Sequence, residues 1–125
     1  MKITILDGKT LGSDIDMTVF GKDAVIYDTT SPEDTTSRIA DSEIVIVNKV
    51  KLNGDNLKNA KNLKLICIAA TGYDNIDTEY CKAHGIAVCN VCGYSTQSVA
   101  QLTLALALSL SVHLGEYCEY VRCEN

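Results

Sequence analysis

The chain has 125 residues, of which 46% are hydrophobic and 22% are charged, values typical of one folded globular domain and not of a disordered chain. Its 11 basic and 16 acidic residues give a net charge of -5 without any basic run, so the composition argues against a nucleic-acid partner. If the ligand is a small anion, its site must supply local attraction through backbone N–H groups or one placed cation.

Apolar runs bounded by turn residues predict five short strands, at residues 3–6, 24–27, 44–47, 65–69 and 87–90. The first run is too short for a signal peptide, and the longest apolar stretch, 99–112, is interrupted by polar residues and shorter than the ~18 residues of a membrane span. We therefore expect a cytoplasmic protein that has no membrane partner.

Helix signals lie between these strands. A weakly supported helix is predicted within residues 10–23, and three side chains are predicted to cap the helices that follow, Ser31 (to about residue 40), Asn53 (54–60) and Asp77 (78–84). Gly85 is predicted to end the third of these in the left-handed conformation. Ser95 is predicted to cap a long apolar helix, with a further helical piece at 116–122.

Strands that alternate with helices predict an α/β fold, a flavodoxin-like doubly wound parallel sheet of five strands followed by a long helix. In such sheets the ligand lies beyond the carboxyl ends of the strands. Asn48 and Lys49 follow the third strand, and Thr71, Gly72 and Tyr73 follow the fourth.

The turn after the fourth strand is the first candidate binding site. Gly72 has no side chain to keep a ligand off the backbone, and successive N–H groups there can cradle a carboxylate or phosphate. Lys49 would add a positive charge. Two plainer interpretations stay open at this point: Gly72 serves a tight turn alone, and Lys49 is a solvated surface lysine.

Several kinds of reactive site are missing from the sequence. It contains no G-x-G-x-x-G or Walker loop and no G-x-S-x-G elbow, and neither His84 nor His113 has a carboxylate and a nucleophile arranged around it.

The six cysteines are predicted to be reduced thiols. Cys89 and Cys92 have redox or zinc spacing, but no second pair completes a four-ligand site, so no metal site is predicted. We predict a binding domain that holds no catalytic residue of its own.

Three ordered segments, residues 63–77, 84–91 and 94–101, resemble the N-terminal substrate domain of the D-isomer-specific 2-hydroxyacid dehydrogenases, and are most similar to the glycerate dehydrogenase and hydroxypyruvate reductase branch. The resemblance implies a substrate-binding domain at 1–94 and a connecting helix at 95–125 that leads to a dinucleotide-binding domain. That domain, with the family's arginine, glutamate and histidine, would lie beyond residue 125, so the chain is expected to be a fragment that is inactive alone.

The resemblance also implies roles for individual residues. The amides of Thr71 and Gly72 would hold the substrate carboxylate, with Asn48, Lys49 and Tyr73 bordering the same pocket. Thr96 and Gln101, at the start of the long helix, would face the nicotinamide end of NAD or NADP. Two positions depart from the family pattern: Cys92 replaces a usual proline, and Gln101 replaces a frequent glutamate.

The implied reaction is reduction of a 2-keto acid of the hydroxypyruvate or glyoxylate type to a D-2-hydroxy acid, by a homodimer when full length. Three alternatives to this function are a receiver domain, a thioredoxin-like module and a non-enzymatic domain. A receiver domain would need an aspartate at Asn48, and a thioredoxin-like module would need Cys89 at a helix N-terminus. The third is a truncated or split non-enzymatic domain that binds a small carboxylate or a partner protein.

Overall fold

The computed structural model describes residues 1–123, which form two compact units: Met1–Cys92, and a second unit that begins at Gly93. Each unit is described by itself. The first contains the whole sheet and the turns on which the candidate site depends, and the second contains two helices.

Five parallel strands form the sheet of the first unit, in the order β2-β1-β3-β4-β5. Their bounds are β1 (Ile3–Ile5), β2 (Val25–Ile26), β3 (Ile44–Val47), β4 (Leu65–Ile68) and β5 (Ala87–Cys89). This confirms the predicted α/β fold with its five-stranded parallel sheet. Because all strands run the same way, the turns that follow β1, β3, β4 and β5 meet at one edge.

Three helices of the first unit begin at the predicted caps: α1 (Pro32–Ile39), α2 (Gly54–Leu57) and α3 (Thr78–Ala83). The side chains of Ser31, Asn53 and Asp77 each accept a hydrogen bond from a backbone N–H of the first turn, which satisfies donors that the helix itself leaves free. After α3, Gly85 has a φ of 70°, the left-handed conformation expected there.

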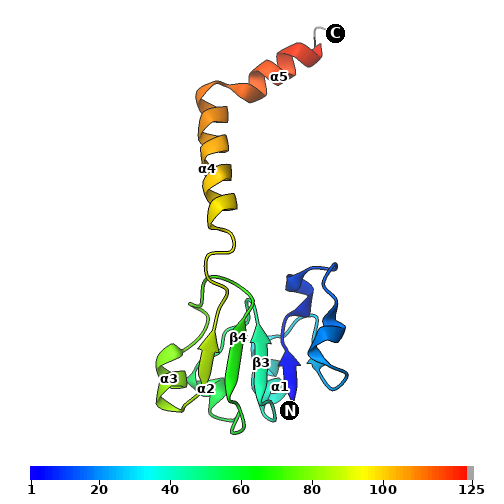
Figure 1. Ribbon diagram of the computed structural model, residues 1–125, viewed down its shortest axis with the longest axis vertical. Helices are drawn as coiled ribbons and strands as arrows, with labels where there is room; N and C mark the ends of the chain where they lie inside the picture. Colours follow the sequence, from blue (N-terminus) through cyan, green and yellow to red (C-terminus); the bar gives the residue numbers. More distant parts are fainter. Residues whose placement is uncertain (124–125) are drawn as a thin grey trace. The chain divides into compact units, whose positions relative to one another are not determined.

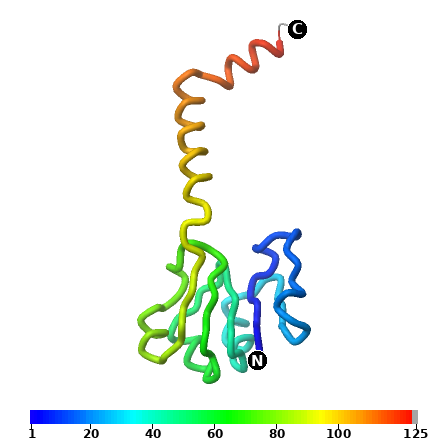
Figure 2. Tube along the Cα trace, viewed as in Figure 1, coloured from blue at the N-terminus to red at the C-terminus, as the bar shows by residue number. Residues whose placement is uncertain are grey.

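The segment between β1 and β2 differs from the prediction. In place of one helix within 10–23, it forms two short 3-10 helices, η1 (Gly8–Leu11) and η2 (Met17–Phe20). Gly12 and Gly21, with φ of 108° and 90°, end them. Val19 is 72% exposed, so this segment offers little apolar surface to hold a longer helix against the sheet. Figure 2 shows this segment, in blue, on the side of β1 away from β3.

The hydrophobic core lies on one face of the sheet. Alternate residues of β3 and β4 (Val45, Val47, Ile66, Ile68) pack in one cluster with side chains of α1, α2 and α3 (Ile39, Leu57, Cys81). Figure 1 shows α1 and α2 behind β3 and β4. Packing in this core fixes the positions of the strand ends. The turns that carry the candidate site residues follow directly after these ends.

The second unit consists of α4 (Thr96–Ser111) and α5 (Leu114–Cys123), separated at His113, which has a φ of 50°. Ser95 precedes α4 as predicted, but its side chain makes no capping hydrogen bond, so that part of the prediction is wrong. Among the described residues no single helix is long and apolar enough to cross a membrane. The two helices meet that test only as a pair bent by 62°.

Candidate functional site

The turn after β3 is built around a buried carboxylate. Asp7, which follows β1 and is only 4% exposed, accepts hydrogen bonds from the backbone N–H groups of Asn48 (2.9 Å), Lys49 (2.5 Å) and Val50 (3.2 Å). These bonds join the ends of two neighbouring strands and use every N–H group of this turn. The turn is therefore held in one conformation and has no free backbone donor for a ligand.

The side chains of Asn48 and Lys49 differ in exposure. The amide nitrogen of Asn48 donates to Thr10 Oγ1 at 3.0 Å, while its Oδ1 is buried without a hydrogen-bond partner among the described residues. The Lys49 side chain is exposed and forms no ion pair in the part of the chain that the structure describes. The exposed ammonium group of Lys49 is therefore the group of this turn that can contact a small acid.

The turn after β4 has the opposite character. Within residues 1–123, none of the N–H groups of Thr71, Gly72 and Tyr73 donates a hydrogen bond. A Cβ added to Gly72 would meet only the carboxylate of Asp74, at 3.7 Å, and Gly72 has no positive φ. The protein's own packing therefore does not require glycine here. These three exposed N–H groups, which have no protein acceptor in residues 1–123, are here called the cradle, and groups of this kind can bind an anion.

Four side-chain hydrogen bonds hold the cradle in place. Asn75 donates to the carbonyl oxygens of Val50 (2.9 Å) and Asn48 (3.4 Å), and so ties the β4 turn to the β3 turn. Asn90, after β5, donates to the Thr71 carbonyl at 2.7 Å. On the same side, Thr71 Oγ1 donates to a carbonyl of the β5 turn at 3.1 Å. The cradle is thus fixed from both neighbouring strands while its N–H groups stay free.

Four of the predicted residues, Asn48, Lys49, Thr71 and Gly72, lie on the turns of two adjacent strands, which Asn75 joins. Tyr73 follows them but is 53% exposed, and its side chain lines a separate cavity of about 170 Å3 with Thr78, Val88 and Asn90. Thr96 and Gln101 are exposed residues of α4 in the second unit, and their contact with a nicotinamide stays a prediction.

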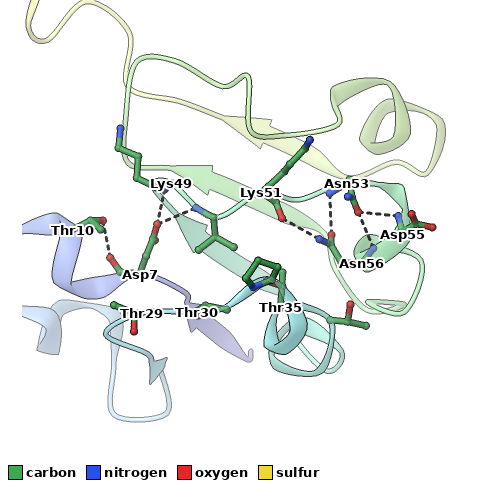
Figure 3. Close-up of a pocket in the computed structure, with 13 residues that line it drawn as sticks. Asp7, Thr10, Thr29, Thr30, Thr35, Lys49, Lys51, Asn53, Asp55 and Asn56 are labelled. Carbon is green, nitrogen blue, oxygen red and sulfur yellow. Dashed lines mark hydrogen bonds between the residues drawn. The ribbon is translucent and has the colours of Figure 1, made fainter.

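A larger cavity of about 620 Å3 lies on the other side of the β3 turn (Figure 3). Its lining includes Asp7, Lys49, Thr35 and Asn56, but not Thr71, Gly72 or Tyr73. Most of its polar groups already have partners: Thr35 donates to the Ser31 carbonyl, and Asn56 to that of Lys51. Volume alone would favour this cavity, but the free donors lie at the β4 turn, and we place the candidate site there.

Neither histidine lies at this site. The His84 ring stacks on Tyr80 of α3, and its Nδ1 is 2.8 Å from the Tyr80 carbonyl oxygen. His113 belongs to the second unit and pairs with Glu116 at 3.3 Å. Cys89 ends a strand and does not begin a helix, which argues against the thioredoxin-like alternative, and the described residues contain no cluster suited to a metal ion.

The sequence interpretation missed the residues that position the site. Asp7, Asn75 and Asn90 act through backbone groups of the turns, and none was predicted to do so. The sequence contained one signal for Asp7. It is an acidic residue directly after an apolar strand, at the edge of the sheet where backbone N–H groups that follow an adjacent strand need acceptors. No comparable signal marks the two asparagines, because amide side chains are common in any loop.

Comparison with known proteins identifies the family of this chain. Residues 3–117 match a family described as D-isomer specific 2-hydroxyacid dehydrogenase, catalytic domain. A hydroxypyruvate reductase of Blautia hydrogenotrophica is 35% identical, and a glycerate dehydrogenase of Methylorubrum extorquens is 34% identical. Each alignment covers 97% of this chain but only 39% of the relative.

A solved structure supports the same assignment. The D-lactate dehydrogenase of Aquifex aeolicus, determined with NAD and lactic acid, superposes with a TM-score of 0.71 at 28% identity, over 88% of this chain and 33% of that one. The family match spans most of the chain, and so does not favour the alternative of a truncated or split non-enzymatic domain that binds a small carboxylate or a partner protein. This chain belongs to the D-isomer-specific 2-hydroxyacid dehydrogenases, and matches the part of them described as the catalytic domain.

Proposed function

We propose that this chain is the substrate-binding part of an NAD(P)-dependent oxidoreductase that reduces a 2-keto acid of the hydroxypyruvate or glyoxylate type to a D-2-hydroxy acid. The observation that carries the proposal is the β4 turn, where the N–H groups of Thr71, Gly72 and Tyr73 have no partner in residues 1–123. A carboxylate has enough lone pairs to accept several such bonds at once.

The residues around the cradle suit an acid of this size. Lys49 supplies a positive charge in a protein whose net charge of -5 would otherwise repel an anion. Asn48, at the end of β3, adjoins the β4 turn through the hydrogen bond that Asn75 donates to its carbonyl oxygen. With the carboxylate at the β4 turn, the adjoining carbonyl carbon would be held in one orientation, which is the main catalytic contribution a binding domain can make.

The cofactor proposed for the whole protein is NAD or NADP, which supplies hydride to that carbon. The fit of the dinucleotide to this chain is poor, because the sequence has no glycine-rich loop to receive its phosphates. We therefore assign this chain one wall of the cleft, with Thr96 and Gln101 toward the nicotinamide. A homodimer and a cytoplasmic location complete the proposal for the whole protein.

Amide NMR of the isotopically labelled chain, titrated with hydroxypyruvate and glyoxylate, tests this function directly. We expect the resonances of Thr71, Gly72 and Tyr73 to shift, because their N–H groups gain an acceptor. Those of Lys49 and Val50 should move less, since Asp7 already holds them. The methyl esters of the same acids are the control. Equal shifts with acid and ester, or shifts confined to the 620 Å3 cavity, would contradict the assignment.

A further inference from the structure

Two cysteines lie side by side on the sheet face opposite the core. Cys67 of β4 and Cys89 of β5 are register partners in adjacent parallel strands. Ile66 and Ile68, the neighbours of Cys67, belong to the core, so alternation along the strand directs Cys67 and Cys89 to the other face. Cys89 is exposed and Cys67 is half-buried, so the pair is open to small molecules.

The backbone geometry suits a bond between the two sulfurs. Neighbouring strands of a sheet are about 4.8 Å apart, within the span of roughly 4.4 to 6.8 Å between the Cα atoms of disulfide-bonded cysteines. Both thiols are free in this structure. Burial raises the pKa of the Cys67 thiol, and the neighbouring Cys89 raises it further. The exposed Cys89 is therefore the thiol that reacts first, and Cys67 the one that resolves.

The remaining cysteines are placed differently. Cys81 belongs to α3 and is buried in the core, and Cys118 and Cys123 belong to the second unit. Cys92 is exposed, and its Sγ lies 3.3 Å from the Asn90 side-chain oxygen. No other two cysteines in residues 1–123 are register partners in the sheet.

We propose that Cys67 and Cys89 form a reactive dithiol that a low-molecular-weight disulfide, such as oxidised glutathione, converts to a cross-strand disulfide. The Cys89 thiolate attacks the glutathione disulfide, which forms a mixed disulfide and releases one glutathione thiolate. The Cys67 thiolate then attacks Cys89 Sγ and releases the second. The two cysteines are oxidised and one glutathione disulfide is reduced to two thiols. This inference does not depend on the proposed function.

The new bond would join the strands that lead into the anion cradle. Asn90, directly after Cys89, holds the Thr71 carbonyl, and Val91 N–H donates to the Ala70 carbonyl at 3.0 Å. Oxidation would therefore restrain the turns after β4 and β5 together, immediately beneath the proposed substrate carboxylate. The dithiol is a modification site that adjoins the cradle without contributing a group to it.

The test is reaction of the reduced chain with oxidised glutathione, followed by alkylation, intact mass measurement and peptide mapping. We expect loss of two alkylatable thiols, one cross-link between the Cys67 and Cys89 peptides, and full reversal by dithiothreitol. In Cys67→Ala, glutathione should remain bound at Cys89, while Cys118→Ser should behave as the unchanged protein. A cross-link between Cys89 and Cys92, or mixed disulfide without any cross-link, would overturn the proposal.

A trivalent arsenical provides a second readout that needs no oxidation, because phenylarsine oxide binds tightly only where two thiols can bridge one arsenic atom. We expect tight binding to be lost in both Cys67→Ala and Cys89→Ala and retained in Cys118→Ser. Circular dichroism of each variant verifies its fold. Retention of tight binding in a folded Cys67→Ala variant would show that the reactive pair lies elsewhere.

Discussion

The turns after β3 and β4 are neighbours at one edge of the sheet, yet they use their backbone N–H groups in opposite ways. The three N–H groups of the β3 turn all donate to Asp7, whereas those of Thr71, Gly72 and Tyr73 donate to nothing in residues 1–123. The closed turn positions side chains, and the open turn presents donors. This difference would allow one edge to be rigid and still bind the proposed ligand.

The largest expected effect comes from opening the closed turn. Asp7→Ala would leave three N–H groups without an acceptor, at a site where the carboxylate is almost fully buried. We expect a loss of roughly 3 to 5 kcal/mol in the free energy of unfolding, measured by urea denaturation. Asp23→Ala, which removes an exposed carboxylate, is the matched control. Equal stability of the two variants would contradict the assigned role of Asp7.

Closing the open turn should affect binding and not folding. Because a Cβ at Gly72 meets only ordinary contacts, Gly72→Ala should unfold at the same urea concentration as the unchanged chain. The added methyl group would keep a carboxylate away from the backbone, and we expect about tenfold weaker binding of hydroxypyruvate, near 1.4 kcal/mol. Gly115→Ala, also free of close contacts, is the control. Unchanged affinity in folded Gly72→Ala would remove the cradle from the proposed site.

Lys49 allows a finer test. Its side chain belongs to the β3 turn, but its positive charge is proposed to attract the anion that binds at the β4 turn. Lys49→Gln should leave stability unchanged, because the ammonium group has no ion pair in the described chain. We expect two- to fivefold weaker binding, roughly the strength of an exposed charge pair. The difference should shrink at high salt. Lys61→Gln is the control. If both substitutions weaken hydroxypyruvate binding equally, the effect comes from the net charge of the protein and not from the position of Lys49.

The sequence predicted the fold well because the relevant signals are local. Apolar runs marked the strands, and Ser31, Asn53 and Asp77 capped helices as expected. The segment at 10–23 was mispredicted because two of its few apolar residues, Ile15 and Val19, remain exposed. Val19 is 72% exposed, so its side chain contributes little apolar burial that could stabilise a longer helix.

The site was predictable only in part, for a related reason. The positions of Asn48, Lys49, Thr71 and Gly72 follow from where strands end. Which turn is closed depends on Asp7, 41 residues before Asn48 in the chain, and no local pattern reports such a partner. The proposed contacts of Thr96 and Gln101 depend on groups outside the first unit and stay predictions.

The smallest expected effect lies at the opposite edge of the sheet, where Glu43 accepts hydrogen bonds from Lys64 (2.8 Å) and the Lys2 N–H (3.2 Å). These contacts, that of Lys64 foremost, hold the pKa of Glu43 below its ordinary value of 4.5. A lowered folded-state pKa means that the ionised group stabilises the protein above pH 4.5, and that this contribution is lost as the pH falls through the lower folded value. Glu43→Gln should therefore lower the Tm slightly at pH 7, with the difference from the unchanged chain vanishing in strong acid. Thermal melts from pH 2 to 7 measure this in ~1-unit steps, with Glu119→Gln, an exposed residue of α5, as the control.

Because Glu43 is far along the strands from both turns, hydroxypyruvate affinity at pH 7 should be the same in the Glu43→Gln variant. A change in affinity would mean that the carboxyl-end turns respond to sheet stability in general, and the contrast between a closed and an open turn would lose its meaning for binding.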